Sequence, residues 1–184
     1  RGQVKDDDWS LFWHGLNKGK RSIQVDLGSP EGRELLIALI AQPGESNGMF
    51  LTNFPARGWL SFDALCAQRP DLVMVSIVGN HDGSSAVDYT VNPATGFPWA
   101  TGPRHLDAPF NHLLPAWDCL TGQMAVAGLL AAERHRRLTG DGQVVQIALS
   151  DVALAMVRHR GTIGGVASDH FPLVADLIRR ETSG

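Results

Sequence analysis

The chain has 184 residues, of which 43% are hydrophobic and 19% are charged, and its formal net charge is -3. This composition is typical of a globular protein with a sizeable core, and the slightly acidic balance gives no reason to expect nucleic acid as a partner. The two distant cysteines argue against a disulfide framework and a structural zinc site, and no apolar run is long enough to span a membrane, so we expect a reducing, cytoplasmic location.

The first third of the chain alternates segments typical of strands and helices. Residues 22–27 alternate polar and apolar side chains, which predicts a strand. Ser29 is a good N-cap, and the Pro that follows it suits the first turn of a helix, so we expect a helix over residues 30–41. A short apolar run at residues 49–52 predicts a buried strand.

The middle of the chain continues this alternation and then becomes irregular. Ser61 predicts the cap of a second helix that ends near residue 68. Residues 72–78 are rich in valine and predict a buried strand. The stretch 79–117 carries many prolines and glycines, so we expect a long irregular loop, and loops of this length in compact domains tend to be functional.

The last regular elements complete the pattern of an α/β protein. Residues 119–138 predict a helix that is apolar at first and basic at its end, which suits the helix dipole. Residues 144–149 predict another strand, and Asp151 begins a further helix. Strands that alternate with helices predict a mostly parallel sheet with flanking helices, and ligands of such sheets bind beyond the carboxyl ends of the strands.

Several familiar site motifs are missing from the sequence. It contains no dinucleotide-binding glycine pattern, no Walker loop and no nucleophile elbow. His105, Asp107 and His112 fall in the proline-rich stretch without the spacing of metal ligands, so we interpret them as surface polar residues. We therefore expect no bound metal.

Four segments, in one order and spacing, carry a family resemblance. They are NKGKRSI from Asn17 with DLGSPEGRELL from Asp26, TNF at 52–54, PAWD at 115–118, and LTGDGQVV from Leu138 through Asp151. Together they resemble the family III (CaiB/BaiF-like) CoA transferases over residues 17–157. The resemblance implies a Rossmann-like fold that is part of a larger, interlocked homodimer, and an enzyme of acyl-CoA metabolism.

Asp118 occupies the position of the family's nucleophilic aspartate. From the residues alone, an N-cap acid of the following helix is the simpler interpretation. The resemblance implies that its carboxylate attacks an acyl-CoA thioester to give a mixed anhydride, and then carries CoA as an aspartyl-CoA thioester until a carboxylic acid accepts it. Because anhydrides hydrolyse in water, we expect a poorly solvated site, with Trp117 and Pro115 as candidate walls.

The resemblance also implies a site for CoA, which acts as a substrate thioester and not as a permanently bound cofactor. Each implied residue has a plain alternative: a core or turn position for the uncharged ones and a solvated basic face for the lysines and arginines. The family motif is not continued after Phe54, where Arg57 is the candidate phosphate contact. The implied CoA contacts are Lys18, Lys20, Arg21, Val25, Asn53, Phe54, Arg57 and Leu149.

Two further residues are expected on the substrate side. Asp88 matches an acid of the family that is expected either to orient substrate or to close a turn. Residues 92–118 resemble the mesaconyl-CoA (2-methylfumaryl-CoA) C1–C4 transferases, which move CoA between two carboxyls of one C5 molecule, and His112 is then the expected contact of the free carboxylate.

Two alternatives stay open for the function. One is a 2-methylacyl-CoA racemase or epimerase, a related enzyme with a catalytic histidine about eleven positions after the acid that matches Asp88. Trp99 occupies that place here and no histidine follows before His105, so this alternative is disfavoured. The other alternative is a catalytically silent CoA-binding fragment.

Family members are considerably longer, and the sequence lacks an initial Met. We therefore expect residues 1–160 to be a large CoA-binding domain without its first strand and glycine-rich opening. We expect residues 161–184 to be a linker or detached segment.

Overall fold

The computed structural model describes residues 5–6, 9–101, 105, 107–159 and 176–177. The chain divides into two compact units, residues 1–36 and residues 37–184, which we describe separately. The predicted segment 161–184 lies outside the described residues except at positions 176–177. In the part of the chain that the structure describes, no helix has the length and apolar character needed to cross a bilayer.

The first unit is small and consists of short elements. They are the antiparallel pair β1 (Lys5–Asp6) and β2 (Trp9–Ser10), helix α1 (Leu11–Leu16) and the greater part of helix α2 (Pro30–Ile40). The hydroxyl of Ser29 accepts a hydrogen bond from the backbone N–H of Gly32 at 3.0 Å. The predicted cap and helix are therefore confirmed.

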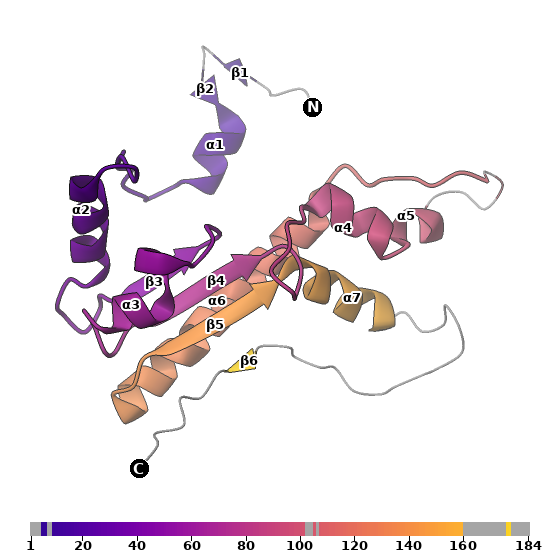
Figure 1. Cartoon of the computed structure of the whole chain (residues 1–184). Helices are drawn as coiled ribbons and strands as arrows, with labels where there is room; N and C mark the ends of the chain where they lie inside the picture. The colour runs from indigo at the N-terminus through magenta and orange to yellow at the C-terminus, as the bar shows by residue number, and fades with distance from the viewer. Residues whose placement is uncertain (1–4, 7–8, 102–104, 106, 160–175, 178–184) are drawn as a thin grey trace. The chain divides into compact units, whose positions relative to one another are not determined.

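The second unit is built on a sheet of three parallel strands (Figure 1). The strands β3 (Met49–Thr52), β4 (Val73–Val78) and β5 (Gln143–Ala148) lie in the order β3-β4-β5, and the two-residue β6 (Asp176–Leu177) pairs antiparallel with β5. The helices are η1 (Gly58–Leu60), α3 (Phe62–Cys66), α4 (Asp88–Ala94), α5 (Phe97–Ala100), α6 (Ala116–Thr139) and α7 (Leu149–His159). The predicted α/β class with a mostly parallel sheet is confirmed.

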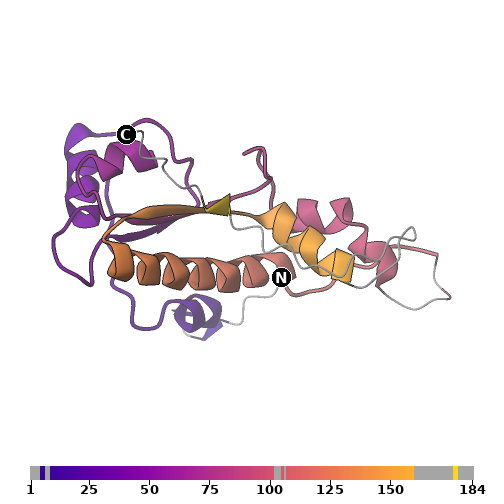
Figure 2. The same cartoon turned by 90° about the horizontal axis from the view of Figure 1, so that it is seen from below.

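Helix α6 lies along one face of the sheet, and α3 lies on the other side (Figure 2). The side chains of Val75 and Val145 belong to a buried cluster that includes Ala125 and Ala132 of α6. The helix presents small residues to the sheet: a Cβ added at Gly128 would lie 3.0 Å from a methyl carbon of Val145. The backbone of α6 therefore lies close to the sheet, and this explains why the helix carries the small residues Gly and Ala on its inner face.

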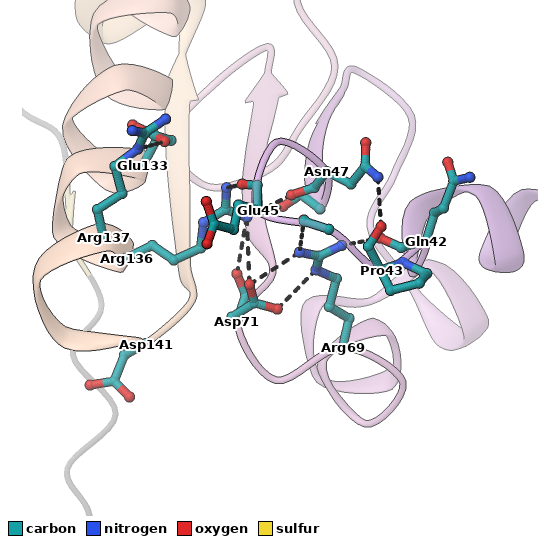
Figure 3. A network of polar contacts seen from close by, with 12 residues as sticks. Gln42, Pro43, Glu45, Asn47, Arg69, Asp71, Glu133, Arg136, Arg137 and Asp141 are labelled. Carbon is teal, nitrogen blue, oxygen red and sulfur yellow. Dashed lines mark hydrogen bonds and ion pairs between the residues drawn. The ribbon is translucent and has the colours of Figure 1, made fainter.

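The amino edge of the sheet is held by two buried arginines (Figure 3). Arg136, near the end of α6, donates hydrogen bonds to the backbone oxygens of Asn47 at 2.8 Å, Gly48 at 3.2 Å and Glu45 at 3.1 Å. Arg69 binds both carboxylate oxygens of Asp71, at 2.8 and 3.1 Å, and the backbone oxygens of Gly44 and Gln42. These contacts tie backbone carbonyl oxygens of residues 42–48 to two buried guanidinium groups, and they fix the loop that leads into β3.

Gly48, the last residue of the loop before β3, lies where only glycine fits. Its φ angle is +73°, and a Cβ at this position would lie 2.1 Å from the Nε atom of Arg69. Both the backbone conformation and the space therefore require glycine.

Two sequence predictions are corrected by the structure. Residues 22–27 are not assigned to a strand, because an alternating pattern predicts an extended chain but a strand also needs a partner for its backbone groups, and Ile23 is exposed. The predicted irregular stretch 79–117 contains α4 and α5. Pro98 lies in the first turn of α5, where a missing N–H costs little, and Pro93 lies one residue before the end of α4.

Replacing Arg136 with Met should destabilise the fold by about 3 kcal/mol, because three backbone carbonyl oxygens lose a buried, charged donor. Urea unfolding of the complete protein that contains this chain measures this change. Arg134→Met, on the exposed side of the same helical turn, is the matched control and should cost less than about 0.5 kcal/mol. Equal losses in both variants would contradict the role given to Arg136.

The hydrogen bond from Arg69 holds the pKa of Asp71 below its ordinary value of 3.8, and the charges of Arg69 and Arg136 lower it further, against the effect of burial. A carboxyl with a lowered folded-state pKa contributes stability above its unfolded pKa and loses it as the pH falls through the folded pKa. The difference in urea midpoint between the natural protein and Asp71→Asn should therefore be constant near neutral pH and shrink below pH 3.8. A difference that persists unchanged in acid would contradict this prediction.

Candidate active site

The carboxyl edge of the sheet gathers the candidate functional residues of the second unit. Helix α6 runs back along strands β4 and β5, so its first turn lies where those strands end (Figure 1). Asp118 is the third residue of α6 and its side chain is exposed; the N-cap is Pro115, so the interpretation of Asp118 as an N-cap acid is wrong. We expected a poorly solvated carboxylate at this position, and the described part of the chain does not bury it.

The first turn of α6 is capped from another helix. The N-cap residue, Pro115, has no side-chain acceptor to offer. Instead, one carboxylate oxygen of Asp88, the first residue of α4, accepts hydrogen bonds from the backbone N–H groups of Trp117 at 2.8 Å and Asp118 at 3.2 Å. Asp88 is only 3% exposed, so its carboxylate is committed to the helix end and lies away from solvent.

A chain of side-chain amides holds the wall beside Asp118. The indole N–H of the buried Trp117 donates to Asn92 Oδ1 at 2.9 Å, and the amide N–H of Asn92 donates to Asn111 Oδ1 at 2.8 Å. Trp117 was predicted as a wall of the site, and its ring also packs edge-on against Phe97, with ring centroids 5.3 Å apart. A buried indole with its N–H satisfied is a rigid surface, so this wall is fixed in place.

His112 belongs to the same aromatic group. Its ring lies edge-on to Phe97 and Trp117, with centroids 5.8 and 6.1 Å apart, and its Nδ1 atom lies within hydrogen-bond distance of the backbone oxygen of Leu114. Its Nε2 atom is buried and meets no hydrogen-bond partner in the described structure. His112 therefore packs as part of the wall, and a carboxylate can reach Nε2 only if neighbouring residues move.

A cavity of about 590 Å³ opens beyond the ends of β4 and β5, beside α4 and α7. At its rim, the Nδ1 atom of His81 lies 2.9 Å from the carboxylate of Asp151. Polar residues of the lining include Asn80, Thr90, Thr95 and Ser150. The position agrees with the expected place of ligands in parallel sheets. No group of three metal-ligating side chains comes together within the described ranges.

The residues expected to contact CoA fall into both units. The side chains of Asn53, Phe54 and Arg57 follow β3 at the carboxyl edge and are exposed, and Phe54 reaches 61% exposure, which is unusual for an aromatic residue. Leu149 is buried against Trp117 in a small apolar cluster and has a structural role there. The remaining four lie in the first unit, where the cations are exposed and the valine is half-buried: Lys18, Lys20, Arg21 and Val25.

Three polar residues of this edge are not predicted by the sequence pattern. Asn92 and Asn111 lie 19 residues apart in the chain, and His81 lies 70 residues from Asp151. No local pattern links such positions, because each pair forms only when separate loops meet at the sheet edge. The sequence offers one signal for these residues, which is the number of polar side chains in the long stretch between β4 and α6.

Comparison with known sequences gives a consistent family. The model of CoA-transferase family III matches residues 1–170. The 2-methylfumaryl-CoA isomerase of Chloroflexus aurantiacus is 62% identical over 161 residues, which cover 88% of this chain and 39% of that protein. The succinyl-CoA:mesaconate CoA-transferase of Haloarcula hispanica is 31% identical over 83% of this chain and 41% of that protein. The chain thus spans about two fifths of the length of these curated relatives.

Solved structures agree with the sequence comparison. A CaiB/BaiF family protein from Brucella suis superposes with a TM-score of 0.73 at 27% identity, over 84% of this chain and 42% of that chain. A protein from M. tuberculosis superposes with a TM-score of 0.68 at 24% identity, over 78% of this chain and 42% of that chain, which shows the shared fold.

Replacing Trp117 with Phe should keep the aromatic packing but leave the buried Asn92 oxygen without its donor. The expected loss is about 1 to 3 kcal/mol of unfolding free energy, measured by urea titration. Trp99→Phe is the matched control, because Trp99 is 66% exposed and its replacement should change stability by less than about 0.5 kcal/mol. Equal effects of the two changes would exclude the Trp117–Asn92 bond as a stabilising contact.

Proposed function

The chain belongs to CoA-transferase family III, and from this premise we propose that the complete protein that contains it moves CoA between an acyl-CoA thioester and a carboxylate, with Asp118 as the covalent carrier. The observation that carries the proposal is the position of Asp118 in the first turn of α6, where Asp88 binds its backbone N–H at 3.2 Å. A fixed helix end can orient a nucleophile that must approach a carbonyl carbon in a defined direction.

The proposed reaction has four steps. An oxygen of the Asp118 carboxylate attacks the thioester carbonyl carbon, and the C–S bond breaks to release the CoA thiolate and leave a mixed anhydride. The thiolate attacks the aspartyl carbonyl and expels the substrate carboxylate, which gives an aspartyl-CoA thioester. The accepting carboxylate then attacks this thioester to give a second anhydride, and the thiolate attacks its acyl carbonyl, so that Asp118 returns as a carboxylate.

Water must be excluded for these steps, because both anhydrides are hydrolysed readily. Asp118 is exposed in the described residues. We propose that further protein covers it, either segments of the kind that make the curated relatives longer or a second subunit of an interlocked homodimer. A cytoplasmic location belongs to the same proposal, since CoA thioesters are the substrates.

We propose intramolecular transfer as the specific activity. The 62% identity with a 2-methylfumaryl-CoA isomerase supports a C5 dicarboxylyl-CoA as substrate and both of its carboxyls as donor and acceptor. His112 is proposed to contact the free carboxylate after the aromatic group opens. The exposed Asn53, Phe54 and Arg57 are proposed to bind CoA through stacking, polar and phosphate contacts. The basic residues of the first unit are proposed separately as contacts of CoA phosphates.

The experiment is to incubate the complete protein with 2-methylfumaryl-CoA, trap with hydroxylamine, and locate the modified residue by peptide mass spectrometry. A hydroxamate on Asp118 is the expected result. Asp118→Asn should lower the turnover number by at least about 10⁴-fold, because the amide is a very poor nucleophile. Asp107→Asn, an exposed acid of the neighbouring loop, is the control and should retain activity.

The racemase alternative predicts a different outcome. It requires exchange of deuterium at the α-carbon of a saturated 2-methylacyl-CoA with Asp118 unlabelled. Full turnover of the Asp118→Asn variant would sink the transferase proposal, and the absence of both activities would favour a silent CoA-binding protein.

A further inference from the structure

Asp88 combines two properties that are unusual in one side chain. It is a charged residue with only 3% exposure, and its carboxylate accepts hydrogen bonds from two successive backbone N–H groups of another helix. The second of these N–H groups belongs to Asp118 itself. The side chain therefore touches the backbone of the proposed nucleophile across 30 residues of sequence.

In the described part of the chain, the N-cap residue of α6 makes no side-chain hydrogen bond to the first turn. The N–H of Ala116 donates to the backbone oxygen of Leu114 at 2.8 Å, and the N–H of Cys119 donates to that of Pro115 at 3.0 Å. The two N–H groups between them, those of Trp117 and Asp118, have Asp88 as their acceptor. Since Pro115 offers no side-chain oxygen, the conformation of this turn depends on a residue of α4.

A contact between Asp88 and the substrate fits this arrangement poorly. The carboxylate is buried, and one of its oxygens is already shared by two donors. The proposed substrates are themselves carboxylates, and a second negative charge close to them would repel them. The geometry favours the other expectation for Asp88, in which it organises a turn.

We propose that Asp88 is a positioning residue for Asp118: by holding the two N–H groups, it fixes the first turn of α6 and so sets the direction in which the Asp118 carboxylate leaves the helix. This inference rests on the proposed function, since it gives a direction to the proposed nucleophile. Misplacement of a reacting group by about 1 Å can cost 10²-fold in rate, so the predicted effect falls on the chemical step and not on substrate affinity.

The test compares Asp88→Ala with Asp88→Asn in the complete protein. The Ala variant removes the acceptor and should slow the turnover number and the single-turnover labelling of Asp118 by about 100-fold, with KM nearly unchanged. The Asn variant keeps an oxygen of the same reach but without the charge, so it should recover most of the rate, to within about tenfold of the natural protein.

A helix cap elsewhere provides the matched control. The hydroxyl of Ser61 caps α3 by accepting the N–H of Ala64 at 3.3 Å. Ser61→Ala should lower the melting temperature but leave the labelling rate of Asp118 unchanged. If Asp88→Ala does not fold, Asp88→Glu decides, because it keeps a carboxylate but displaces it by one methylene and should also slow labelling.

The outcomes separate this inference from the proposed function. Absence of label on Asp118 in the natural protein would overturn the proposed function and this inference with it. Normal labelling of the natural protein, together with equally fast labelling of Asp88→Ala or Asp88→Glu, would overturn only the positioning role. A raised KM with an unchanged turnover number in both Asp88→Ala and Asp88→Asn would assign Asp88 to substrate binding instead.

Discussion

A buried charged side chain holds each end of helix α6 by hydrogen bonds between that side chain and the backbone of a different segment. At its start, the carboxylate of Asp88 meets two N–H groups; near its end, the guanidinium of Arg136 meets carbonyl oxygens of the loop before β3. Both contacts match the polarity of the partner: anion to donors and cation to acceptors. Because the helix also packs on β4 and β5, its ends are fixed relative to the sheet. The first turn of α6 is therefore held in place at the carboxyl edge.

The two edges of the sheet differ in what their polar groups do. At the amino edge, Arg69, Asp71 and Arg136 bind backbone carbonyls and one another, and none of them lies near the carboxyl edge. At the carboxyl edge, the buried amide and indole of Asn92 and Trp117 hold a wall while Asp118 stays exposed beside it. The polar groups of the amino edge thus serve stability, whereas the carboxyl edge combines stabilising polar contacts with an exposed carboxylate that can meet a ligand.

The sequence predicted the regular elements well and the polar contacts poorly. Strands β3, β4 and β5 form as their short apolar runs predict, but the burial expected of residues 49–52 is wrong, since Met49 and Leu51 are 43% and 48% exposed. Residues 22–27 have an equally good pattern but pair with no strand in the described structure. Asp118 was found through a family resemblance, since a helix-start aspartate is ordinary by itself. The contact between Asp88 and α6 could not be predicted, because it depends on how a 30-residue connection folds back and not on any local preference.

The connection between β4 and β5 carries the wall, the cap and the proposed nucleophile, while strands β4 and β5 contribute core side chains and backbone pairing. Frame and chemistry are therefore encoded in different stretches of the chain. Substitutions or length changes within the connection can reshape the space offered to an acid without disturbing strand register. Proteins of this architecture can therefore change their acyl donors and acceptors through substitutions in the β4–β5 connection, while the sheet stays the same.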